Sequence, residues 1–212
     1  MITIAACLVV ASALYCLAAL LFMAYKTFTF GRRRFYSAPQ GSKYKGVFYA
    51  FVPGMMPWEK ESAGNHLPTY FAGIIYHAGI FCSFFVLAMH ITGMVFPAWF
   101  LSLLRLGLAA SASSGFSLLI KRVAMKKLAK ISCPDDYFSN ALVDIFLVVS
   151  FFSTYSPRFL LPSYITAIVM FAYIPVGKIR HCFFFFYARF LLGVFFGRRN
   201  TFPPQRNTNS IT

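Results

Sequence analysis

The sequence contains uncharged stretches that are long enough to cross a lipid bilayer. No charged side chain occurs over residues 2–25, or between His66 and Arg105. About 20 helical residues cross a hydrocarbon layer of roughly 30 Å, because each residue adds about 1.5 Å. The whole chain has 59% hydrophobic residues, 12% charged residues and a mean hydropathy of +0.67. This balance is atypical of soluble domains, and we predict an all-α integral membrane protein.

Breaks and charges in these stretches predict five spanning helices. Pro97 marks the end of the second, because proline lacks the amide hydrogen that a helix interior needs. The spans are expected at Ile2–Tyr25, from His66 to Pro97, at Ala98–Ile120, at Phe138–Tyr155, and between Arg158 and Lys178. Residues 1–200 would form one five-helix domain, followed by a polar, disordered tail over residues 201–212. The first span lacks a preceding basic segment, so we expect it to be retained rather than cleaved.

Basic residues indicate the orientation of the bundle. Of the 20 Lys and Arg residues, 18 lie in three alternate segments: Lys26, Arg32, Arg33, Arg34, Lys43, Lys45 and Lys60; then Lys121, Arg122, Lys126, Lys127 and Lys130; then Lys178, Arg180, Arg189, Arg198, Arg199 and Arg206. Cytoplasmic loops carry an excess of Lys and Arg. We therefore predict the N-terminus outside and the C-terminus in the cytoplasm.

The formal net charge of +15 follows this topology. A nucleic-acid-binding face would gather its basic residues on one soluble fold, so we expect no nucleic-acid partner. A basic cytoplasmic surface attracts anionic lipid headgroups and can also dock an acidic soluble partner. The aromatic and basic run from His181 to Arg199, and residues 48–58, are both expected to lie along that interface.

Two histidines are the strongest candidates for function. His77 and His181 lie inside or at the edge of apolar stretches, where an imidazole is costly unless it is used. The predicted topology puts both near the cytoplasmic side. Two imidazoles at one depth can bind a haem iron from both faces. The five cysteines form no C-x-x-C pair, so they offer no iron–sulfur or zinc site.

The other two histidines are open to more than one interpretation. His90 lies 13 residues beyond His77, so it is roughly 20 Å further along a straight helix and on another face. It is a candidate ligand of a second haem, or it bonds a neighbouring helix, or it contacts a quinone. His66 falls at the predicted boundary, which favours a role at the helix start or at the headgroups.

Two charges inside predicted spans are further candidates. Asp144 lies on the inner half of the fourth span, where it could relay protons, bond a ligand imidazole, or pair with Lys178 or Arg180. Arg105 lies in the outer half of the third span. It could bind a haem propionate or a quinone carbonyl, or extend its guanidinium to the outer interface.

These residues carry a resemblance to a known family. The segment from His66 to Ile80, with His77 followed by Ala-Gly-Ile, resembles the second span of the gamma subunit of respiratory nitrate reductase. Pro175, six residues before His181, resembles the end of that family's fifth span. Related membrane cytochromes belong to the sulfite-reduction-associated and heterodisulfide-reductase complexes. Outside these two spans, the resemblance is one of topology alone.

The resemblance implies a b-type cytochrome in the inner membrane of a prokaryotic cell. It implies haem b ligated by His77 and His181, a membrane quinone as the substrate, and a cytoplasmic iron–sulfur partner subunit. A second haem does not carry over, because Leu87 and Ser163 stand where the family has those ligands. The chain would then be the electron-transfer subunit of an oxidoreductase. The alternative is a haem-free membrane anchor or small transporter whose histidines only bridge helices.

Overall fold

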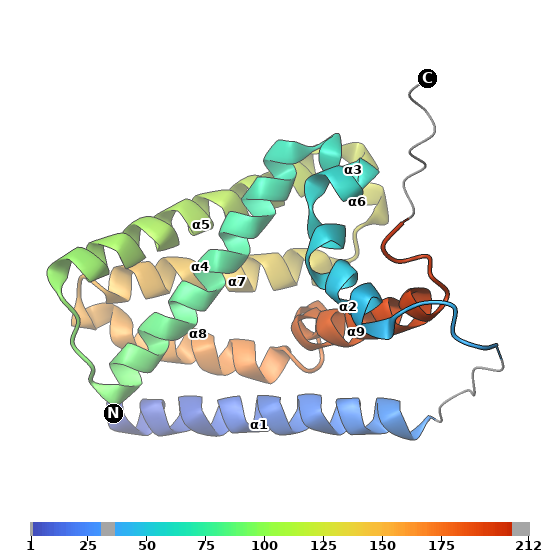
Figure 1. The fold of residues 1–212 in the computed structure, drawn as a ribbon. Helices are drawn as coiled ribbons and strands as arrows, with labels where there is room; N and C mark the ends of the chain where they lie inside the picture. The colour runs from blue at the N-terminus through green and yellow to red at the C-terminus, as the bar shows by residue number, and fades with distance from the viewer. Residues whose placement is uncertain (1, 31–36, 205–212) are drawn as a thin grey trace. The chain divides into compact units, whose positions relative to one another are not determined.

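The computed structural model describes residues 2–30 and 37–204, and its regular structure over these residues is helical (Figure 1). The α-helices are α1 (Ile2–Thr29), α2 (Lys43–Phe51), α3 (Glu61–Gly64), α4 (Leu67–Thr92), α5 (Ala98–Ala124), α6 (Lys126–Ile131), α7 (Pro134–Ser153), α8 (Leu160–Tyr173) and α9 (His181–Arg198). Short 3-10 turns are η1 (Pro53–Met55), η2 (Pro57–Glu59), η3 (Pro157–Phe159) and η4 (Lys178–Arg180).

Five helices are long and apolar enough to cross a membrane, as the sequence predicts. They are Ile2–Thr29, Leu67–Thr92, Ala98–Ala124, Pro134–Ser153 and Lys178–Arg198. The fifth differs from the expected stretch between Arg158 and Lys178. That stretch holds α8, whose 14 residues reach only about 21 Å along a helix axis. The run expected to lie along the interface instead forms α9, which meets the length and composition of a span.

The chain divides into two compact units. The first comprises Met1–Met23 and Pro68–Arg180, and the second Ala24–Leu67 and His181–Thr212. The domain predicted over residues 1–200 therefore contains parts of two units. Most of the predicted tail lies outside the described residues, which end at Pro204.

The first unit is built around α7. Helices α5 and α8 both pack against it (Figure 1), and it is the most buried of the five candidate spans. Its start follows local rules, because Pro134 occupies the first turn and Asp136 accepts a hydrogen bond from the Cys133 amide at 2.9 Å. At the end of α4, Gly93 adopts a φ of 69°, which suits glycine and stops the helix before Pro97.

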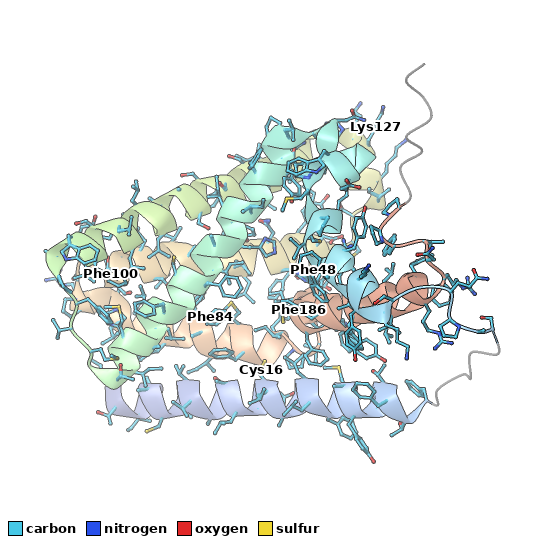
Figure 2. The ribbon with its side chains drawn as sticks, viewed as in Figure 1. Cys16, Phe48, Phe84, Phe100, Lys127 and Phe186 are labelled. Atoms are coloured by element: carbon cyan, nitrogen blue, oxygen red, sulfur yellow. The ribbon has the colours of Figure 1, made fainter. Side chains whose placement is uncertain are left out.

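Aromatic and aliphatic side chains fill the interior of the first unit. Phe84 of α4, labelled in Figure 2, packs against Phe146 of α7 and Phe171 of α8, and the ring centroids are 5.5 and 5.6 Å apart. Val86 and Leu108 are fully buried in the same core. These contacts hold α4, α5, α7 and α8 together and give the buried polar groups described below an apolar surrounding.

The second unit depends on a close crossing of α2 and α9. A Cβ built on Gly46 would meet the backbone of Gly193 and Gly197, and one built on Gly193 would meet the backbone of Val47. Gly193 and Gly197 are four residues apart, the spacing of small residues that lets membrane helices approach closely. Phe186 of α9, labelled in Figure 2, stacks on Phe51, and the ring centroids are 6.2 Å apart.

Candidate functional site

His77 lies on α4 of the first unit, and its ring is oriented by its own helix. Nδ1 is 2.7 Å from the carbonyl oxygen of Gly73, one turn earlier. A carbonyl can only accept, so Nδ1 carries the hydrogen and donates it. A histidine that binds a metal through Nε2 is commonly held by such a bond from its other nitrogen. His77 is also exposed, so the ring does not lie in the core of its unit.

His181 is the first residue of α9, in the second unit, and it is exposed. The structure therefore describes His77 and His181 in separate units. Their meeting at one haem stays a prediction. His66, one residue before α4, is exposed as well. Over the described residues, no three His, Cys, Asp or Glu side chains are grouped to hold a metal ion.

His90 bridges two helices of the first unit. Its Nε2 lies 3.1 Å from the hydroxyl of Ser153, so the C-terminal parts of α4 and α7 are joined. The Ser153 hydroxyl donates to the carbonyl oxygen of Ser150 at 2.8 Å and therefore accepts from His90. Of the roles predicted for His90, interhelical bonding is the one the structure contains.

Asp144 is buried in the middle of the first unit, with 1% of its surface exposed. It faces α4 and α5: a Cβ built on Gly115 would meet both its Oδ1 and the ring of Tyr76. The Tyr76 side chain interacts with the Asp144 carboxyl group, while the Tyr76 hydroxyl donates its hydrogen bond to the carbonyl oxygen of Asn140 at 3.3 Å. Among the residues that the structure describes, no group is in hydrogen-bonding geometry with either carboxyl oxygen of Asp144.

The suggested pairing of Asp144 with Lys178 or Arg180 is not found. Lys178 pairs instead with Asp136, in the first turn of α7, and Arg122 lies 3.4 Å from the same carboxyl oxygen. Asp136 lies nearer than Asp144 to the N-terminal end of α7. Long basic side chains can reach it there while their aliphatic stems stay at the membrane boundary. The sequence reasoning missed this ion cluster, although Asp136 directly follows the proline that starts the helix.

Arg105 is held at the end of α7. Its Nε donates to the Thr154 hydroxyl at 3.0 Å, and a terminal nitrogen donates to the Thr154 carbonyl oxygen at 2.5 Å. The guanidinium also lies over the ring of Tyr155, 3.9 Å from its centroid. A cation is favourable there, because the last carbonyl groups of a helix carry partial negative charge. These contacts give Arg105 a structural role at the end of the span.

Several hydroxyl groups are buried in the first unit. Ser83, Ser150 and Ser163 are fully buried, and their oxygens have no hydrogen-bond partner among the described residues. Ser111, also buried, donates to the carbonyl oxygen of Tyr76 at 2.8 Å and fills the space left by Gly79. For Ser150 the available signal was the polarity of α7, whose mean hydropathy is the lowest of the candidate spans although it is the most buried.

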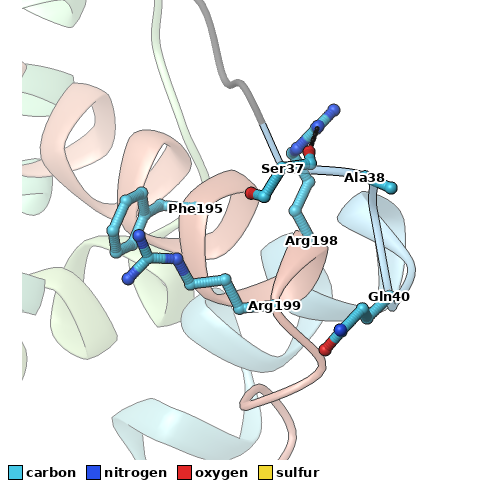
Figure 3. A pocket seen from close by; sticks show the side chains of 6 residues that line it. All are labelled: Ser37, Ala38, Gln40, Phe195, Arg198 and Arg199. Carbon is cyan, nitrogen blue, oxygen red and sulfur yellow. Dashed lines mark hydrogen bonds between the residues drawn. The ribbon is translucent and has the colours of Figure 1, made fainter.

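A small basic pocket lies at the end of α9 in the second unit (Figure 3). Its volume is about 130 Å³, and its lining includes Ser37, Gln40, Phe195, Arg198 and Arg199. Arg199 stacks over Phe195, 4.0 Å from the ring centroid, and Arg198 donates to the Ser37 carbonyl oxygen at 3.2 Å. Two guanidinium groups at a helix end suit an anionic lipid headgroup.

Comparisons with known proteins add no relative. No protein-family model matches the chain, and neither the curated proteins nor the solved structures contain a match.

Proposed function

We propose that the chain is a membrane b-type cytochrome subunit, with His77 and His181 as the axial ligands of one haem. The observation that carries the proposal is the bond from His77 Nδ1 to the Gly73 carbonyl oxygen, at 2.7 Å on a membrane-spanning helix. This bond selects the tautomer whose Nε2 lone pair can ligate iron. His181, the first residue of α9, is the proposed second ligand. In the proposed orientation it shares a depth with His77 only if the stretch between Arg158 and Lys178, rather than α9, crosses the membrane.

Haem b, when bound, would accept and release single electrons, and its ligands and surroundings would set its potential. The space at Gly79 does not contribute to a haem site, because Ser111 fills it. Because His77 and His181 are both exposed, we expect the haem to bind outside the core of the first unit. We propose one haem for each chain, since His90 is engaged with Ser153.

The proposed carrier is a membrane quinone, and the proposed partner is a cytoplasmic iron–sulfur subunit of a respiratory oxidoreductase. The distribution of basic residues supports an orientation with the N-terminus outside and the C-terminus in the cytoplasm of a prokaryotic cell. Asp144 remains a candidate near the quinone. Arg105 is not, because its guanidinium is engaged with Thr154 and Tyr155.

The ligand assignment is tested by measuring the haem bound per purified chain. We expect about one haem in the wild type, and its loss in both His77→Ala and His181→Ala. His66→Ala is the matched control, since His66 is an exposed histidine outside the proposed pair. Full haem content in either ligand variant would contradict the assignment.

A second candidate function is a haem-free membrane anchor or small transporter. The bond between His90 and Ser153 favours it, because this histidine bridges two helices of the first unit. Wild-type protein that binds no haem when purified from haem-replete cells would support this candidate.

A further inference from the structure

Asp144 poses a problem that the proposed cytochrome function does not solve. Asp144 is 1% exposed in a membrane-spanning helix, and over residues 2–30 and 37–204 neither of its carboxyl oxygens has a partner in hydrogen-bonding geometry. An ionised carboxylate in an apolar interior is costly unless a cation or several donors compensate it. Lys178 and Arg122 are both engaged with Asp136 in the first turn of α7.

The helices around Asp144 supply few polar groups. From α4, Tyr76 is the titratable side chain that interacts with the carboxyl group. From α5, Gly115 faces it and brings no side chain. On α7, Asn140 lies one turn earlier, and its side-chain oxygen is also buried, with no hydrogen-bond partner in the described part of the chain. On α8, Tyr164 is a buried titratable residue of the same core.

We propose that Asp144 is a proton-exchange site, with Tyr76 as the group that orients its carboxyl. Adding a proton to the carboxylate removes the uncompensated charge and supplies an O–H donor. The buried side-chain oxygen of Asn140 is an acceptor one turn away. Tyr76 has a single hydroxyl hydrogen, so it can donate a hydrogen bond either to the Asn140 carbonyl oxygen or to the Asp144 carboxyl group, but not to both at once.

A proton fits this site better than a metal cation. Metal ions such as Na⁺ need several oxygen ligands arranged around them. The described neighbours of Asp144 at Gly115 are the ring carbons of Tyr76 and a residue without a side chain, and neither supplies an oxygen ligand from its side chain there. A proton needs no shell, only one acceptor atom.

Buried hydroxyl groups extend from this site along the first unit. Because His90 lies beside Ser153 and α4 runs parallel to α7, Ser83 lies within about one turn of Asp144 along the bundle. The hydroxyl oxygens of Tyr173 and Ser139 are 3.2 Å apart, and α8 runs antiparallel to α7. Ser163 is therefore at about the level of Ser150. These hydroxyl groups can both donate and accept, which a route for proton exchange requires.

Infrared spectroscopy of the purified full-length chain in liposomes tests the proposal. The chain has three aspartates, Asp135, Asp136 and Asp144, so carboxyl-¹³C aspartate labelling reports on few groups. We expect a carbonyl stretch of a protonated carboxylic acid at neutral pH. It should shift on ¹³C labelling, shift again on transfer to D₂O, and disappear in Asp144→Asn.

Asp135→Asn is the matched control, because its carboxyl lies at the start of the same helix and is partly exposed. The band should persist in that variant. A wild-type spectrum without the labelled band, a band that remains in Asp144→Asn, or a band that does not shift in D₂O would each overturn the proposal. Absence of the labelled band in the wild type overturns the proposal even if Asp144→Asn fails to fold, whereas assignment of the band to Asp144 depends on its loss in that variant. The measurement needs no haem, so its failure is separate from failure of the cytochrome assignment.

Discussion

His90 Nε2 and Ser153 Oγ lie 3.1 Å apart and connect α4 to α7 inside the first unit. His90→Ala would leave the Ser153 hydroxyl without this donor, and interhelical bonds in membranes contribute on average about 0.6 kcal/mol. We therefore expect a modest loss of stability, measured by thermal unfolding in detergent. His90→Ala should keep its haem, and loss of haem in this variant would show that His90 is a ligand after all.

Gly115 is expected to tolerate no side chain. In Gly115→Ala the added Cβ would meet Asp144 Oδ1 and the Tyr76 ring, so both of these buried side chains would have to shift. Overpacking of this kind costs about 1–3 kcal/mol. Gly73→Ala is the matched control on α4, because nothing lies within 4 Å of its added Cβ. It should be neutral or slightly stabilising when both variants are compared by thermal unfolding.

The crossing of α2 and α9 should be equally intolerant. Gly46→Ala would place a methyl group against the backbone at Gly193 and Gly197, which cannot move as a side chain would. We expect faster limited proteolysis of the second unit in this variant. Gly64→Ala serves as the control in the same unit, since its nearest atom would be 3.4 Å away. Equal proteolysis rates for both variants would argue against the close crossing.

Lys60 provides a prediction about pH in the second unit. Burial, and then the nearby charge of Arg189, lower the pKa of Lys60 from its ordinary value of 10.5. The unfolded chain then binds more protons than the folded one between the two pKa values. Charged Lys60 therefore destabilises the fold at neutral pH, and this destabilisation is lost as the pH rises through the lowered pKa. Lys60→Met should therefore be more stable than the wild type at neutral pH.

That difference should shrink as the pH rises through the lowered pKa towards 10.5. Unfolding of the wild type and Lys60→Met, followed at neutral pH and again above pH 10.5, measures it. A gap between the two proteins that stays constant across this range would contradict the assigned cause.

The sequence predicted much of the fold because bilayer thickness constrains helix length. The number of spans and the break at Pro97 were confirmed. The fifth span was assigned to the wrong stretch, because Lys178, Arg180 and Arg189 suggested a surface segment. In the structure α9 carries Arg189 towards α2, where it lies 3.5 Å from the carbonyl oxygen of Ala50.

The candidate site was less accessible to sequence reasoning. Asp144 stood out as a charge inside a span, but its neighbours come from α4 and α5, more than 25 residues away along the chain. Lys178 was expected beside Asp144 or at the surface. It pairs with Asp136 instead, because α7 begins at Pro134 and so places Asp136 in its first turn. Pairings of this kind depend on packing between helices, which local patterns do not encode.

The cytochrome account is tested most directly by the dithionite-reduced minus oxidised absorption spectrum of the purified chain. The account predicts sharp b-type bands in the wild type and their loss in His77→Ala and His181→Ala. A flat difference spectrum from correctly folded wild-type protein, purified from haem-replete cells, would contradict it.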